Sequence, residues 1–351
     1  MKLILASVVV LASASAAYAQ PTPFGRLSSE LLDVVPPSAR VTGAPGSMAV
    51  RQAACRSSSP AADVRRRIVD IAVQEWAFFG FSVVDQTRIE ERRPPAPPYR
   101  RRFRWLSPEE SARVADSIAG YWAVTPDGRW ILDRQNEAWN GPSGVAARWR
   151  YPWSAAFISW VMCEAGLGSP DRFERAVAHH AYIDQAIRAR DHRDRPSAFE
   201  AFDIGEAPVR PGDLLCSARR PAYRSIADRR RQMGEGARTH CDIVVKLHDD
   251  AESGAERRIL AIGGNVRGSV GLKILPSVRT PGGNLHPRSQ PGGPGARTMF
   301  AHLQLRAVGI ETDALDRTPT MKALACGPGL QLPAVLAAAR VVAGWLDADR
   351  C

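Results

Sequence analysis

The chain has 351 residues, 45% of them hydrophobic, and a formal net charge of +11. This length is enough for one sizeable core and a small second domain. Almost all of the positive charge comes from arginine and no nucleic-acid-binding motif accompanies it, which argues against DNA or RNA as a partner. Arginine clusters at 65–67, 100–104 and 229–231 are expected to be solvated faces, although such clusters can also attract anionic envelope polymers.

The first 19 residues have the pattern of a secretory signal. Lys2 precedes an apolar run from Leu3 to Leu11, and Ala17-Tyr18-Ala19 forms a cleavage site before Gln20. This run is too short to span a bilayer, and no later run reaches spanning length without charges. We therefore expect secretion across the inner membrane, a periplasmic location and no transmembrane segment after signal cleavage.

The next part of the chain changes from irregular to helical. Residues 20–60 are rich in Pro, Ser, Ala and Gly and predict a flexible leader. Apolar residues at helical spacing predict a helix over 64–79, and a capping box at 107–110 predicts a second helix to about Gly120. Residues 125–150, with three tryptophans among Gly, Asn and Pro, are expected to form an ordered loop.

Later segments predict helices followed by a sheet. Two helices are expected over 155–165 and 173–189. The expected strands are 213–216, 242–247, 258–262, 270–275 and 299–305. Helices first and a meander-like sheet afterwards argue for an α+β domain over 61–310. The C-terminal tail, 311–351, is expected to contain one helix over 333–346.

Ser154 is the first candidate site residue, because it follows Pro152-Trp153 at the expected start of a helix. As a cap, its hydroxyl would accept a hydrogen bond from a backbone N–H of the first turn. As a nucleophile, it would stand at the positive end of the helix, where free N–H groups can also hold an oxyanion. Position alone does not separate these interpretations.

Two further candidates stand on neighbouring expected strands. His240 begins one strand and can act as a general base, but a histidine there is more often a surface or hydrogen-bonding residue. Asn265 ends the next strand after two glycines, where it can orient an imidazole or simply form a turn. On the expected helix over 173–189, at most one of His179 and His180 can face the core.

No metal or other cofactor is expected. His179 and His180 lack the i, i+4 partner of a helical zinc pair. His240 and Cys241 are adjacent on a strand, so their side chains point to opposite sides and cannot easily share an ion.

Taken in order, these motifs resemble the papain-like amidases and peptidases of bacterial cell walls, the CHAP and NlpC-type domains. In many of these a helix opens Trp-Cys-Ala-Ala-Phe with Cys as nucleophile, and this chain reads Trp-Ser-Ala-Ala-Phe over 153–157. Pro-Gly-Asp at 211–213, His240 before an Ile-Val run and Gly-Gly-Asn at 263–265 also have counterparts. The chain is most similar to the bacterial domain of unknown function family 2272 (DUF2272), which carries Pro-Trp-Ser-Ala-Ala-Phe-Ile-Ser-Trp. The resemblance covers about Val64 to Val308.

The resemblance implies a papain-like fold, with N-terminal helices packed on an antiparallel sheet and a helical tail after it. It also implies a hydrolase acting on peptidoglycan peptide or a related amide or ester. Ser154 would then be the nucleophile, His240 the base and Asn265 the orienting residue. The candidate substrate-binding residues are Trp153, Asp213, Asp242 and His179.

The serine leaves the activity open. A helix dipole worth about 1 kcal/mol cannot ionise an alcohol, so Ser154 would need His240 to take its proton during attack. The alternative is a catalytically inactive module of the same fold that binds the cell wall or another envelope partner. A structural envelope protein is a third interpretation.

Six cysteines follow the signal, and an even number in an oxidising compartment indicates disulfides. In the papain-like sheet, the strands that carry Cys216 and Cys241 are antiparallel neighbours. The resemblance therefore predicts a Cys216–Cys241 disulfide, and with it the pairs Cys55–Cys163 and Cys326–Cys351.

Overall fold

The computed structural model describes residues 25–326, except 57, 59, 61, 88–105, 194–195, 220–222, 250–256 and 289–296. The helices are α1 (Ser29–Leu32), α2 (Val64–Phe78), α3 (Pro108–Ala123), α4 (Gly128–Trp139), α5 (Ser154–Glu164), α6 (His180–His192), α7 (Ile226–Arg230) and α8 (Pro319–Cys326), with 3-10 turns η1 (Pro37–Arg40), η2 (Gly144–Ala146) and η3 (Ala314–Arg317). The strands are β1 (Val41–Thr42), β2 (Ala49–Val50), β3 (Ser82–Asp85), β4 (Phe199–Phe202), β5 (Leu214–Arg219), β6 (Thr239–His248), β7 (Arg258–Val266), β8 (Ser269–Arg279), β9 (Leu285–Pro287) and β10 (Arg297–Leu305). No helix among these residues is both long and apolar enough to cross a membrane.

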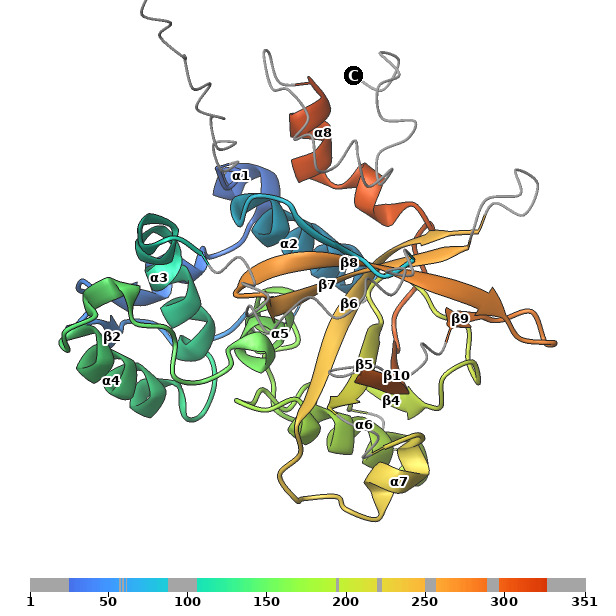
Figure 1. Cartoon of the computed structure of the whole chain (residues 1–351). Coiled ribbons are helices and arrows are strands. Elements are labelled where there is room, and N and C mark those ends of the chain that lie inside the picture. The colour runs from blue at the N-terminus through green and yellow to red at the C-terminus, as the bar shows by residue number, and fades with distance from the viewer. Residues whose placement is uncertain are drawn as a thin grey trace, which may run out of the picture.

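The main sheet has the strand order β3-β8-β7-β6-β5-β10-β4, and β9 pairs with β8. Its pairs are antiparallel except for β3, which lies parallel to β8. Figure 1 shows α3 and α4 to one side of this sheet and α6 and α7 below it. The structure is thus a mixed α+β fold with a mainly antiparallel sheet, as the order of helices and strands predicts.

The two faces of the sheet carry separate apolar clusters, because side chains alternate along each strand. We call one the helix face, since Cys241, Ile243 and Val245 of β6 share the main core with α2 and α5. We call the other the opposite face, where Val244 packs with residues such as Leu215 in a smaller cluster. Every residue of α5 is buried, so this helix is fixed firmly against the sheet.

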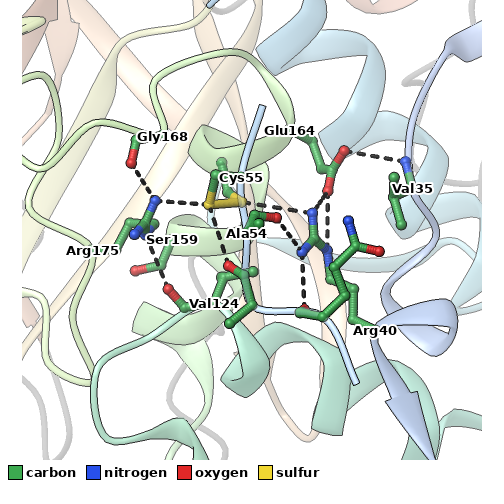
Figure 2. Close-up of a disulfide and its surroundings, with 12 residues drawn as sticks. Val35, Arg40, Ala54, Cys55, Val124, Ser159, Glu164, Gly168 and Arg175 are labelled. Atoms are coloured by element: carbon green, nitrogen blue, oxygen red, sulfur yellow. Dashed lines mark hydrogen bonds and ion pairs between the residues drawn. A yellow bond between two sulfur atoms is a disulfide. The ribbon is translucent and has the colours of Figure 1, made fainter. Parts of the chain in front are cut away.

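The segment expected to be a flexible leader is packed on the domain over 25–56. Arg26 forms an ion pair with the buried Glu75 at 2.6 Å, and a Cβ on Gly120 of α3 would stand 1.8 Å from the carbonyl oxygen of Pro37. The buried Arg40 pairs with Glu164 at the end of α5 (Figure 2). Composition did not reveal this packing, because a few arginines and a cysteine anchor the segment instead of a periodic apolar face.

Two of the predicted disulfides are confirmed. Cys55 is bonded to Cys163 of α5 with a Cα–Cα distance of 5.0 Å, and Arg175 lies against the Cys55 sulfur (Figure 2). Cys216 is bonded to Cys241 across β5 and β6, where the two residues are direct register partners. Cys326 is also disulfide-bonded, while its expected partner, Cys351, lies outside the described residues.

Two arginines expected on solvated faces are buried instead. Arg65 of α2 is fully buried and donates to Asp213 at 2.6 Å. Arg229 of α7 is also fully buried and makes a two-point contact with Asp184, with both distances at 2.6 Å. In these two clusters one guanidinium is buried, because it pairs with a buried carboxylate. The third cluster, 100–104, lies outside the described residues.

One loop prediction and one helix prediction were wrong in detail. The segment expected to be an ordered loop over 125–150 contains α4, whose buried Ile131, Leu132, Gln135 and Trp139 fall at helical spacing. The helix expected from 173 begins only at His180, because the backbone of Ala176 is held by the hydroxyl of Ser159 in two hydrogen bonds. The expected signal segment and the helix expected over 333–346 lie outside the described residues.

Candidate functional site

Ser154 is the first residue of α5, and its hydroxyl does not cap the helix. The cap position belongs to Trp153, and no side-chain capping bond is present there. The Oγ of Ser154 instead lies 2.7 Å from Nε2 of His179, just before α6. Both residues are buried, Ser154 at 7% and His179 at 3% exposure. The cap interpretation of Ser154 is therefore wrong, and the hydroxyl makes a specific tertiary contact.

The other nitrogen of His179 faces hydrogen-bond donors. The backbone N–H of Cys241 donates to Nδ1 at 3.2 Å, and the hydroxyl of Tyr182 also contacts Nδ1. Burial, followed by the charge of Asp242, raises the pKa of Tyr182 well above its usual value, so the phenol keeps its proton.

These donors fix the state of the imidazole. A backbone N–H can only donate, so Nδ1 of His179 must be the acceptor. In the neutral ring the proton then sits on Nε2, which donates to the Oγ of Ser154. A general base needs a free lone pair directed at the nucleophile's proton. His179 therefore anchors Ser154 without being set to activate it.

The second candidate, His240, belongs to a different cluster. Its Nε2 lies 2.9 Å from one carboxylate oxygen of Asp242, and Nζ of Lys273 lies 2.7 Å from the other. Burial raises the pKa of Asp242, but the charges of His240 and Lys273 outweigh this and hold it well below its usual range. The cluster contains a carboxylate that is ionised and fully paired.

Strand alternation places this cluster on the opposite face of the sheet. A Cβ on Gly263 would stand 2.0 Å from Asp242 and 3.1 Å from His240, whereas one on Gly264 would stand 2.5 Å from Phe157 of α5. The two glycines thus let polar side chains approach β7 from one face and α5 from the other, as expected of a Gly-Gly pair. The rings of His179 and His240 meet at the start of β6, with centroids 5.2 Å apart.

A pocket of about 370 Å³ lies beside the start of α5. Trp153, Pro152 and Asn265 line it together with the segment before α5, including Arg148, Trp149 and Arg150. The remaining lining residues are mostly apolar: Leu106, Ser111, Val114, Ile118, Trp139, Val145, Ala146, Ala147 and Gly268. The pocket is therefore an aromatic cavity with two arginines among its lining residues.

The family comparison can now be set beside this geometry. Residues 109–294, more than half of the chain, match the family described as an uncharacterized protein conserved in bacteria (DUF2272). The chain belongs to the DUF2272 family. No curated protein and no solved structure matches it. The family match includes α5, His179, β6 and β7, so the site described above is part of this DUF2272 region.

The candidate residues of this DUF2272 chain separate into three groups. Ser154 and His179 are brought together, and His240 and Asp242 form a cluster with Lys273. Trp153 and Asn265 line the pocket. The hydroxyl of Ser154 is thus paired with His179, where the sequence had predicted His240.

Asp213 has a structural environment. It is fully buried and receives Arg65 at 2.6 Å, His302 at 2.9 Å and the backbone N–H of Leu305 at 3.0 Å. These contacts give Asp213 a structural role, whereas the sequence analysis had placed it among the candidate substrate-binding residues.

Sequence reasoning missed Tyr182 and Lys273 as partners of the two histidines, and it missed the pocket-lining arginines. Tyr182 stands three residues after His179, one helical turn on, which is a usable signal. The usable signal for Lys273 is that it is the one charged residue within an apolar expected strand.

Proposed function

We propose that this DUF2272 chain is a binding module of papain-like type that holds a cell-envelope ligand without hydrolysing it. The observation that carries this proposal is the hydrogen-bond arrangement of His179. Because Cys241 donates to Nδ1, the Nε2 proton faces Ser154, and no lone pair is available there to take the serine proton. A buried serine that accepts this hydrogen bond is suited to positioning the start of α5.

The papain-like assignment is part of the proposal. Its support is the motif order, with α5 opening at Trp-Ser-Ala-Ala-Phe and packing on β6 and β7 of a mainly antiparallel sheet. The position after Trp153, where the resembling enzymes carry a cysteine, lies at the start of that helix.

The envelope location and the wall ligand are also proposed. Two disulfides among the described residues fit an oxidising compartment, and the first 19 residues have the pattern of an export signal. The resembling domains act on peptidoglycan peptides, so a wall peptide is the ligand class that we expect this module to hold.

The competing function is a hydrolase with Ser154 as nucleophile. One observation favours it, namely the 2.7 Å contact between Ser154 and an imidazole at a helix N-terminus. For this function the proton of His179 would have to move to Nδ1, where it would face the N–H of Cys241.

Two measurements decide between the functions. Long-range ¹H–¹⁵N correlation spectra, assigned with His179→Gln, should show His179 protonated on Nε2. Digestion of muropeptides by wild type and Ser154→Ala, across about pH 5 to 8, should release no fragments from either protein. Turnover by wild type that disappears in Ser154→Ala, or a proton on Nδ1, would overturn the binding-module proposal.

A further inference from the structure

We propose that the pocket beside Trp153 binds the C-terminal carboxylate end of a short apolar peptide. This inference rests on the proposed function, since it names the ligand that the module would hold. The site is the cavity of about 370 Å³ between α3, the 145–153 segment and the end of β7. This volume lies in the lower part of the usual range for small-molecule pockets, roughly 300–1,000 Å³, and suits one or two residues.

The walls favour an apolar body. Trp139 and Trp149 meet edge to face with ring centroids 5.1 Å apart. Trp153 stacks on Tyr121 with ring centroids 5.9 Å apart. Val114 and Ile118 of α3 add aliphatic surface. Rigid aromatic walls of this kind bind apolar side chains at little entropic cost.

The charge of the pocket favours an anion. Arg148 and Arg150 both line it, and no carboxylate of the described residues does. Arg150 is exposed and forms no ion pair with any described side chain. A planar guanidinium with free donors matches a carboxylate in two-point geometry.

Arg150 is held in place by a buried glutamine. Gln135 of α4 receives the backbone N–H of Arg150 at 2.9 Å and donates to the carbonyl of Arg148 at 3.3 Å. Gln135 is fully buried, so its two hydrogen bonds fix the backbone of the segment that carries both arginines. A fixed backbone lowers the entropic cost of binding at the guanidinium of Arg150.

Asn265 adds a group that can recognise a peptide bond. It lines the same pocket and has a left-handed backbone, with φ of 55°, a conformation that asparagine tolerates better than most residues. Its half-buried amide is hydrogen-bonded to no described residue. A carboxamide offers both a donor and an acceptor, which is what a peptide N–H and C=O require.

The test compares two probes that differ in one charge: acetyl-leucyl-alanine and its C-terminal amide. Binding is followed by tryptophan fluorescence and by calorimetry. We expect the acid to bind at least about ten-fold more tightly than the amide, and more weakly as salt is raised. Arg150→Gln should remove this preference and Arg150→Lys should keep part of it. The matched control is Arg129→Gln, an exposed arginine of α4 outside the pocket, which should behave as wild type.

Equal affinity for acid and amide, no binding of either probe, or an unchanged preference in Arg150→Gln would each overturn the inference. The proposed function fails separately. Turnover of muropeptides would refute the proposal of a binding module without hydrolysis, but it would not affect the inference that the pocket binds acetyl-leucyl-alanine. Absent turnover together with absent acid binding would refute only this pocket as the ligand site. Circular dichroism and thermal unfolding of each variant show that a loss of binding is not a loss of fold.

Discussion

Nε2 of His179 lies 2.7 Å from Oγ of Ser154, and the same ring accepts the backbone N–H of Cys241. Ser154, the first residue of α5, is thereby connected through one imidazole to the strand that carries the Cys216–Cys241 disulfide. In this arrangement Ser154 has a structural role, and the effect of removing its hydroxyl on the stability of the fold can be measured.

Ser154→Ala should destabilise the fold by about 1–3 kcal/mol, because it leaves the buried N–H of His179 without an acceptor. Urea unfolding followed by circular dichroism measures this change. Ser143→Ala, at an exposed serine, is the control and should change stability by less than about 0.5 kcal/mol. Equal stability of wild type and Ser154→Ala would contradict the assigned role of the hydroxyl.

Lys273→Met should cost about 3–5 kcal/mol, because it removes one of the two charges that compensate the buried Asp242. The pKa of Asp242 is held below its usual range, so its contribution to stability is present above about pH 4 and is lost as the pH falls further. In the variant this loss should begin at higher pH. The control is Lys322→Met, at an exposed lysine. A variant with the acid-unfolding curve of wild type would refute the coupling.

Asp70→Asn should change the pH dependence of stability in the opposite direction. Burial raises the pKa of Asp70 from 3.8 to about 7, despite the opposing charges of Arg66 and Arg67. Between these two values the folded chain holds a proton that the unfolded chain has lost, so stability falls as the pH rises, by up to about 4 kcal/mol.

Removing this carboxyl should therefore flatten the decline and make the variant more stable than wild type at pH 8. Thermal unfolding at a series of pH values measures the effect. Asp63→Asn, at the exposed aspartate immediately before α2, where the side chain makes no capping bond, provides the control. A decline that persists unchanged in Asp70→Asn would have to come from another group.

The two disulfides should contribute unequally. Their sequence separations are 108 residues for Cys55–Cys163 and 25 for Cys216–Cys241. In the chain-entropy treatment these loops correspond to about 5 and about 3.5 kcal/mol. Denaturant titrations of the two double Cys→Ser variants measure the difference. A larger loss from the shorter loop would show that native contacts of Cys241, and not loop closure, determine the ranking.

Much of the fold could be predicted from the sequence, and the reasons differ between elements. The capping box at 107–110 predicts α3, and Ser107 indeed accepts the N–H of Glu110 at 3.2 Å. The central strands were predicted from apolar runs, although β6, β7 and β8 extend further than those runs. The short β3 and β9 carried no comparable signal, because they depend on pairing with β8.

The site was less predictable than the fold. The motif at 153–157 placed Ser154 at a helix start, but the identity of its partner depends on which face of β6 each residue takes. His240 lies in the cluster of the opposite face with Asp242, while His179 comes from the segment before α6. Such convergence between distant segments follows from tertiary packing and is not encoded in local spacing.

The bond between Cys55 and Cys163 has a consequence for the order of folding. Cys55 can form this bond only after Cys163 of α5 has been synthesised, because the two cysteines are 108 positions apart. Contacts between such distant positions slow folding, because a large loop must close before they form. Until α5 is in place, Cys55 is a thiol available to wrong partners, including Cys216 and Cys241 as they emerge. Correct maturation therefore calls for an environment that reshuffles disulfides as well as one that forms them.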